Sequence, residues 1–317
     1  MKVLGGGLFG ASAWDRRFAP DYEFVYDPDC AEYDWLVVFD ELPAAVERLR
    51  CPRERTILCT WEPVSIKSYS KAYTRQFGYL LTNRPPEAER HPNYRLGRGY
   101  FVWFVHRFPL RLGASAERKS KVLSAVCSAK QMKHTEHRSR FRLVEALAKG
   151  IPEMDWFGRG VRPLECKEDA LDAYRYHVAV ENHIGARHWT EKFADAILCE
   201  CLPFYAGDPA LTEIFPAESF IPIPIDDPDE AVRIVRAAIA NDEYSKRREA
   251  ILEAKRLIFE KYNFWSQVIS VIESSPQPSQ LSQPSQLIYS RKALRRHSLA
   301  AALEDGWEHL KRYLRIF

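Results

Sequence analysis

Thr190, Glu191 and Lys192 follow one another after an apolar run that ends at Val180 and a polar loop. The pattern after Thr190 is helical, so Thr190 is expected to be the N-cap and the other two residues to occupy the first turn. Backbone N–H groups and the positive end of the helix dipole favour an anion there, and Lys192 adds a full charge. The segment therefore predicts either a phosphate site or an ordinary capped helix with a solvated Glu–Lys pair.

A second candidate lies near the N-terminus, where three glycines have the spacing Gly5-x-Gly7-x-x-Gly10 after an apolar pair. In dinucleotide-binding domains, glycines at this spacing let the backbone approach a pyrophosphate. Three interpretations are open: an NAD-dependent oxidoreductase, a structural tight turn, or a loop facing a cleft between domains, where an acceptor or a diphosphate approaches. Residues 11–19 form a short segment for a crossover helix, which counts against the oxidoreductase.

The elements that must position these residues alternate between short apolar runs and helical or turn signals, as in α/β folds. The strand-like runs are residues 22–26, 35–39, 56–60, 79–82, 122–127, 176–180, 202–205 and 220–225. The helical patterns are residues 136–149, 191–200, 230–240 and 244–261. A chain of 317 residues is expected to form two domains. The predicted fold class is α/β, with two Rossmann-like domains facing a cleft, which fits a GT-B-like architecture as well as other two-domain Rossmann assemblies.

Changes in composition mark the expected boundaries. We expect an N-terminal Rossmann-like domain at residues 1–115, a second domain at 116–273, a flexible Pro/Ser/Gln-rich linker at 274–288 and a basic amphipathic tail at 289–317. In the tail, apolar residues recur at helical spacing among many lysines and arginines. Such a helix docks on its own protein, docks on a sister subunit in a homodimer, or lies on a membrane surface.

Composition also limits the class of protein. A hydrophobic fraction of 46% with 28% charged residues is typical of globular proteins. The net charge of +3 is too small to indicate nucleic-acid binding. The N-terminal apolar run is too short for a signal peptide or a membrane span, and the 7 scattered cysteines lack paired CxxC spacing. We therefore expect a cytoplasmic protein with reduced thiols, located at the inner face of the membrane if the tail binds lipid.

The segment from Tyr176 to Ile223, YHVAVENHIGARHWTEKFADAILCECLPFYAGDPALTEIFPAESFIPI, resembles the donor-binding signature of the family 10 α-1,3-fucosyltransferases. The matching features are Glu181-Asn182, Thr190-Glu191-Lys192, Pro203, Gly207 and the run from Pro216 to Ile221. Weaker similarity extends upstream, through the helical pattern containing Arg140, through Trp156-Phe-Gly-Arg-Gly, and through Leu58-Cys-Thr-Trp-Glu-Pro-Val-Ser. Residues 1–40 show hardly any resemblance.

The resemblance implies a divergent GT-B enzyme of the bacterial type that transfers L-fucose from GDP-fucose to a hydroxyl of an acceptor glycan with inversion. No metal or other cofactor would be required. The catalytic base would be Glu62. The donor-binding residues would be Arg140, Gly158, Gly160, Glu181, Asn182, His188, Thr190, Glu191 and Lys192. Within this set Arg140 and Lys192 would bind the diphosphate, Glu191 a ribose or sugar hydroxyl, and Asn182 would orient the loop. The Gly5 loop would lie on the acceptor side.

One departure from the family pattern bears on the donor. His188 occupies the position where the family usually has tyrosine, two residues before Thr190. Contacts to the donor sugar or base are therefore expected to differ, and a transferase that uses another nucleotide sugar is an alternative. A catalytically inactive glycan-binding module is an alternative of another class. The acceptor is expected to be a glycan or a lipid-linked glycan.

Overall fold

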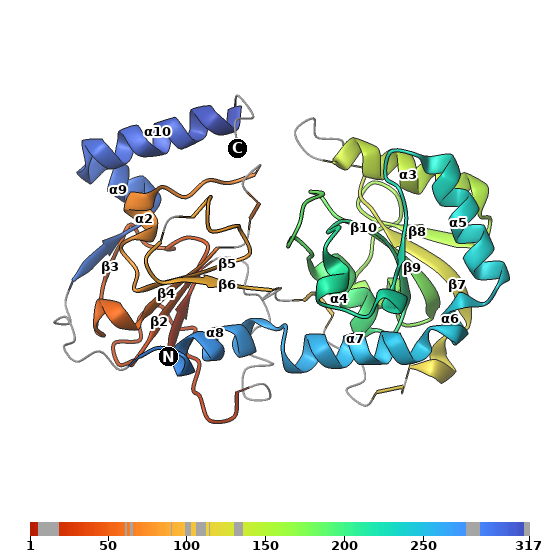
Figure 1. Ribbon diagram of the computed structural model, residues 1–317, viewed down its shortest axis with the longest axis horizontal. Coiled ribbons are helices and arrows are strands. Elements are labelled where there is room, and N and C mark those ends of the chain that lie inside the picture. Colours follow the sequence, from red (N-terminus) through yellow and green to blue (C-terminus); the bar gives the residue numbers. More distant parts are fainter. Residues whose placement is uncertain are drawn as a thin grey trace. The chain divides into compact units, whose positions relative to one another are not determined.

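The computed structural model of the chain resolves into two compact units. It describes residues 1–5, 19–60, 62–63, 66–89, 91–98, 103–105, 112–113, 115–129, 136–276 and 286–313. Unit 1 comprises residues 1–102 and 263–317, and unit 2 comprises residues 103–262 (Figure 1). Among the described helices, none is both long and apolar enough to cross a membrane.

Unit 1 is built on a parallel sheet with the strand order β1-β2-β4-β5-β6. Its strands are β1 (Lys2–Leu4), β2 (Leu36–Phe39), β4 (Thr56–Thr60), β5 (Tyr79–Thr82) and β6 (Tyr94–Leu96). Its α-helices are α2 (Lys71–Thr74), α8 (Phe264–Glu273), α9 (Arg291–His297) and α10 (Leu299–Tyr313). Val25 forms a parallel bridge to Lys2, on the side of β1 away from β2. The order of the chain therefore reverses between β1 and β2, which makes their carboxyl ends a topological switch point, where α/β sheets bind ligands.

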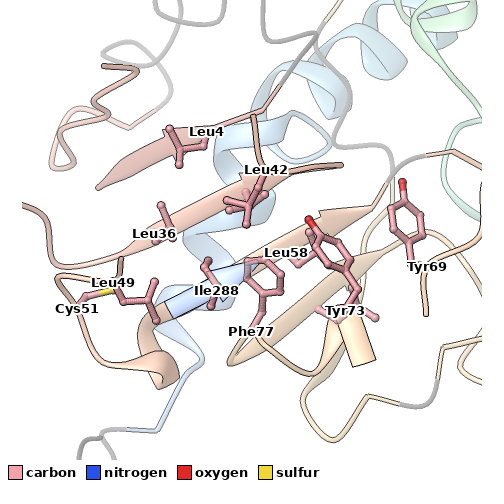
Figure 2. Packing of buried hydrophobic residues seen from close by; sticks show 12 residues of the cluster. Leu4, Leu36, Leu42, Leu49, Cys51, Leu58, Tyr69, Tyr73, Phe77 and Ile288 are labelled. Atoms are coloured by element: carbon pink, nitrogen blue, oxygen red, sulfur yellow. The ribbon is translucent and has the colours of Figure 1, made fainter. Parts of the chain in front are cut away.

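The C-terminal segment completes unit 1. Strand β12 (Leu287–Tyr289) pairs antiparallel with β3 (Val46–Arg48), and Ile288 is 1% exposed in the hydrophobic cluster of this unit. Figure 2 shows the Ile288 side chain in one cluster with Leu36, Leu58 and Phe77. Residues 287 and 288 thus lie in a strand, although we expected residues 274–288 to be a linker. Burial of Ile288 outweighs the polar composition of the residues before it.

Unit 2 has its own parallel sheet, with the strand order β11-β10-β9-β7-β8. Its strands are β7 (Lys121–Val126), β8 (Met154–Phe157), β9 (Tyr174–Val180), β10 (Leu202–Ala206) and β11 (Ile221–Pro222). Its α-helices are α3 (His137–Gly150), α4 (Glu191–Leu198), α5 (Pro228–Ala240), α6 (Glu243–Lys246) and α7 (Arg248–Glu260). The chain passes from β7 outward to β8 and then returns to β9 on the other side of β7, so the switch point of unit 2 lies between the carboxyl ends of β7 and β9.

Most of the elements expected from the sequence are present within a residue or two. Three differ. The expected strand at residues 22–26 forms only a single bridge at Val25, and the expected strand at residues 220–225 is only the two-residue β11. The helical pattern at residues 244–261 is divided into α6 and α7 at Arg247, whose N–H still donates to the carbonyl of Glu243. The expected boundaries at 115 and 273 also differ from the division into units, because α8 and the segment after it pack with unit 1.

Candidate active site

A pocket of about 690 Å³ opens at the switch point of unit 2. Its walls come from the residues after β7 and β8, the end of β9 and the first turn of α4. Its polar and charged lining residues are Ser128, Arg140, Arg159, Glu165, Lys167, His177, Glu191 and Lys192. Four residues expected to bind a donor therefore lie in one pocket, namely Arg140, Gly158, Glu191 and Lys192.

The first turn of α4 is held by a buried carboxylate beneath it. Thr190 is the N-cap, and its hydroxyl oxygen accepts a hydrogen bond from the Lys192 N–H at 3.3 Å. Glu181, fully buried at the end of β9, accepts hydrogen bonds from the Thr190 N–H at 2.8 Å and from its hydroxyl at 2.6 Å. Glu181 thus accepts hydrogen bonds from both polar groups of the N-cap residue. It orients the helix start and does not line the pocket formed by the described residues.

Lys192 carries the positive charge of this turn. Its ammonium lies 2.8 Å from a carboxylate oxygen of Glu191 and 3.6 Å from one of Glu181. Burial lowers the pKa of Lys192, but the two carboxylates outweigh it, so the pKa is raised and the group stays charged. Burial opposes ionisation of Glu191, yet Lys192 and then Lys167 outweigh it and bring the pKa of Glu191 down to about 2. The turn presents a fixed ammonium beside a fixed carboxylate.

Aromatic side chains next to this turn pack into the core of unit 2 and hold the turn in place. Trp189 is 1% exposed and lies edge-on to Phe215 at a centroid distance of 5.0 Å. Phe193, one turn into α4, is fully buried and contacts Phe215 at 5.0 Å and Tyr205 at 5.3 Å. Such aromatic pairs add to the energy of burial and fix ring orientation. Thr190 and Lys192 are thereby attached to the core of unit 2.

Arg140 supplies a second cation from α3. Arg140 is 8% exposed, and its Nη1 donates to the side-chain oxygen of Asn182. Its Nε is buried and has no hydrogen-bond partner within the part of the chain that the structure describes. A buried N–H group without a partner is costly, so an anionic ligand in the pocket would satisfy it. Asn182 thereby orients the Arg140 guanidinium, while its expected role in arranging the loop stays a prediction.

Lys167 and Asp195 were not foreseen from the sequence. The Lys167 ammonium lies 2.5 Å from an oxygen of Asp195, which is fully buried on α4. The other oxygen of Asp195 accepts from the Phe104 N–H at 3.1 Å. The available signal was a single acidic residue on the apolar face of α4, which needs a partner when buried. That partner is a third cation lining the pocket.

Gly158 is required by its backbone, because it has φ +143° and a Cβ there would lie 2.4 Å from the Cys127 carbonyl oxygen. The main chain of β7 and β8 can therefore come together at the wall of the pocket. Of the other expected donor residues, Gly160 and His188 lie outside the described lining. His188 is 7% exposed, with its ring 5.4 Å from that of His183. Their donor contacts stay predictions.

The remaining expected residues belong to unit 1. Glu62 follows β4, and its carbonyl oxygen accepts from the Arg84 Nε and Nη2 groups at 2.9 and 2.7 Å. Gly5 ends β1 with φ +132°, and a Cβ there would lie 2.2 Å from the Phe39 carbonyl oxygen. This close approach of neighbouring strands explains Gly5 structurally, while Gly7 and Gly10 lie outside the described residues. Among described residues, no three His, Cys, Asp or Glu side chains gather as a metal site would need.

Comparison with known proteins identifies the class of enzyme. Residues 116–245 match the family model for the C-terminal domain of glycosyltransferase family 10 (fucosyltransferase). The chain is a glycosyltransferase, and residues 116–245 are similar to a family 10 C-terminal domain. The resemblance seen at Glu181-Asn182 and at Thr190 to Lys192 is thereby confirmed, and this assignment replaces the oxidoreductase interpretation of the Gly5 loop. No curated protein matches the chain.

Solved structures of α1,3-fucosyltransferase share the fold of this glycosyltransferase. One is 15% identical, with a TM-score of 0.56 over 88% of this chain and 90% of that chain. A structure of α1,3-fucosyltransferase with GDP-fucose has a TM-score of 0.57, and one with GDP has 0.52, both at 15% identity. These two cover 88% and 87% of this chain and 90% of each matched chain. The GT-B-like fold of two Rossmann-like units is confirmed.

Proposed function

We propose that the protein transfers L-fucose from GDP-fucose to a hydroxyl group of an acceptor glycan, with inversion at the anomeric carbon. The observation that carries this proposal is the pocket of unit 2, where Arg140, Lys167 and Lys192 converge and the Arg140 Nε has no partner among the described residues. Three cations around one pocket suit the two negative charges of a nucleoside diphosphate. The solved α1,3-fucosyltransferase with GDP-fucose supports fucose as the donor sugar.

The proposed reaction is a single displacement. The acceptor hydroxyl attacks the anomeric carbon of fucose, the bond from that carbon to the diphosphate breaks, and the electron pair leaves with GDP. Glu62 takes the hydroxyl proton as general base, a contribution of about 10²–10⁴-fold. Lys192 and Arg140 stabilise the charge that develops on the departing diphosphate, which is where preorganised cations are most effective. With these cations in place, we propose that no metal is required.

Calorimetric titration tests the donor. GDP-fucose, GDP-mannose, UDP-glucose and NAD are titrated separately into the full chain, and we expect binding of GDP-fucose. Binding of another nucleotide sugar alone would overturn the fucose assignment and retain the transferase. Mass spectrometry of a panel of β-galactosides and N-acetylglucosaminides incubated with GDP-fucose then detects the transferred deoxyhexose. Donor binding with neither transfer nor hydrolysis would favour the inactive glycan-binding module.

The acceptor is proposed to be a glycan at the cytoplasmic face of a membrane, because α10 has an unusual orientation. Its acidic residues point to unit 1: Glu304 accepts from the Lys71 and Ala72 N–H groups, and Asp305 is 6% exposed. Its apolar residues are exposed instead, with Leu303 at 67% and Trp307 at 58%. Arginines and a histidine at the end of α9 are also exposed. An apolar face beside exposed cations suits an anionic lipid surface.

Cosedimentation with vesicles tests this contact. We expect the chain to bind vesicles containing phosphatidylglycerol more strongly than vesicles of phosphatidylcholine alone, and Trp307→Glu to abolish the difference. Light scattering in parallel measures the oligomeric state. A dimer that Trp307→Glu dissociates, without vesicle binding, would assign the α10 face to a second copy and refute the lipid contact.

A further inference from the structure

Arg84 lies two residues after β5 in unit 1, and all three nitrogens of its guanidinium donate hydrogen bonds. It is 4% exposed. Nε and Nη2 donate to the Glu62 carbonyl oxygen at 2.9 and 2.7 Å, and Nη2 also donates to the Lys67 carbonyl oxygen. Nη1 donates to Glu89 at 2.6 Å, a carboxylate that is itself 4% exposed at its side chain. One buried group thus connects both ends of the segment from residue 62 to residue 67.

The guanidinium is itself rigidly held. It lies over the Tyr69 ring at 4.6 Å, and the Arg84 backbone is fixed by two bonds. Its N–H donates to the Thr82 hydroxyl at 3.2 Å, and its carbonyl accepts from the Tyr94 hydroxyl at 2.6 Å. A planar, multiply bonded and stacked guanidinium has few accessible orientations, whereas an ammonium on a flexible stem has many. A lysine at this position could keep the positive charge opposite Glu89, but it could not donate several hydrogen bonds in the fixed planar arrangement of a guanidinium.

The far end of the same segment is tied to the neighbouring strand. The Lys67 ammonium lies 2.7 Å from Asp40, whose N–H donates to the Cys59 carbonyl at 2.8 Å. Asp40 directly follows β2, and Cys59 is in β4, three residues before Glu62. The segment is therefore attached at both ends to the carboxyl edge of one sheet, and Arg84 bridges the two attachments.

We propose that Arg84 is a positioning residue that holds the main chain at Glu62 and at Lys67 and thereby places Glu62 for proton transfer. The inference rests on the proposed function, in which Glu62 is the base. Arg84 acts on the main chain of Glu62, so it controls location more than acidity. Misplacement of a catalytic group by about 1 Å can cost about 100-fold in rate.

Hydrogen exchange tests the positioning without any assay of activity. The Ile66 and Lys67 N–H groups both donate to the Pro63 carbonyl, at 2.9 and 3.1 Å. In Arg84→Lys we expect the peptide covering residues 62–67 to exchange at least about tenfold faster, with unit 2 peptides unchanged. Lys2→Met is the matched control: Lys2 is 3% exposed and paired with Glu47 at 2.8 Å, so its loss destabilises unit 1 away from this segment.

Kinetics then test the consequence. GDP release from GDP-fucose to water serves as the assay, because it needs no identified acceptor. We expect Arg84→Lys to lower kcat about 10- to 100-fold with the KM for GDP-fucose unchanged, and Lys2→Met to leave kcat unchanged. In a Glu62→Gln background, Arg84→Lys should have almost no further effect, because both changes act on one proton transfer. If Arg84→Lys does not fold, Glu89→Gln replaces it, with a smaller effect in the same direction.

Three results would overturn the inference: unchanged exchange in residues 62–67, an equal loss of kcat in Lys2→Met, or a full additional loss in the Glu62→Gln background. Full activity of Glu62→Gln is a different result. It would refute the proposed role of Glu62 as base and with it the catalytic consequence, while the exchange experiment would still decide whether Arg84 holds the segment.

Discussion

Replacing Lys192 with methionine removes the ammonium at the start of α4 while keeping most of the apolar stem. A hydrogen bond to a charged group contributes about 1.5–3 kcal/mol. At about 1.4 kcal/mol per tenfold, the loss corresponds to an increase in the Kd for GDP of about 10- to 150-fold. Glu181 and Glu191, which flank Lys192 at 3.6 and 2.8 Å, would then repel the diphosphate, so we expect the upper half of this range.

The same substitution should also lower the melting temperature, because Glu181 is fully buried and loses its nearest cation. Adding Glu181→Gln to Lys192→Met should restore the melting temperature but not the affinity for GDP. Calorimetry and thermal unfolding measure the two effects, with Lys121→Met as control, since the Lys121 side chain is 50% exposed on the surface of unit 2. A Lys192→Met protein that binds GDP within twofold of the unchanged protein would refute the assignment of this turn to the diphosphate.

Two further predictions concern the walls of the pocket. Gly158→Ala should destabilise unit 2 by about 1–3 kcal/mol, because Gly158 has a positive φ and an added Cβ would meet the Cys127 carbonyl. Gly306→Ala is the control, since Gly306 lies in α10 with open space around it, and it should be neutral or stabilising by about 1 kcal/mol. Thermal unfolding measures both effects. His177 is 2% exposed, and burial lowers its pKa to about 3, so the native state keeps it neutral. In the unfolded chain this histidine takes up a proton near pH 6.5. The contribution of the neutral His177 to the free energy of unfolding should therefore be fully present above that pH and should be lost as the pH drops towards about 3. Urea unfolding measures the free energy of unfolding at pH 7 and at pH 4.5. The difference between the two values should be smaller for His177→Asn than for the unchanged protein, and an equal difference would contradict the argument.

The donor site shows how far local sequence carries a prediction. The N-cap at Thr190 and the position of Lys192 follow from neighbouring residues alone, because a cap depends on a side chain and the N–H groups two or three residues ahead. The pairing of Lys167 with Asp195 depends on residues 28 apart on different elements. A lone acid on the apolar face of a helix indicates that Asp195 has a partner, but the sequence does not identify that partner as Lys167.

The C-terminal segment shows the opposite case. Its helical spacing predicted α10 and its amphipathic character, yet nothing local indicates which face packs inward. The capping of α2 by Glu304 and the burial of Asp305 turn the acidic face towards unit 1 and leave Leu303 and Trp307 exposed. Likewise the strand containing Ile288 exists because β3 and the core of unit 1 accept it.

By itself, the sequence determined the α/β class, most element positions and the helix cap and lysine of the proposed diphosphate site, because periodicity, caps and motif spacing are local properties of a chain. The tertiary structure alone decided that Glu181 accepts hydrogen bonds from the helix cap, that Lys167 lines the pocket, and that Arg84 donates to the Glu62 carbonyl oxygen. Each of these depends on long-range burial of charged groups, which become favourable only when distant elements bring their partners within hydrogen-bond distance.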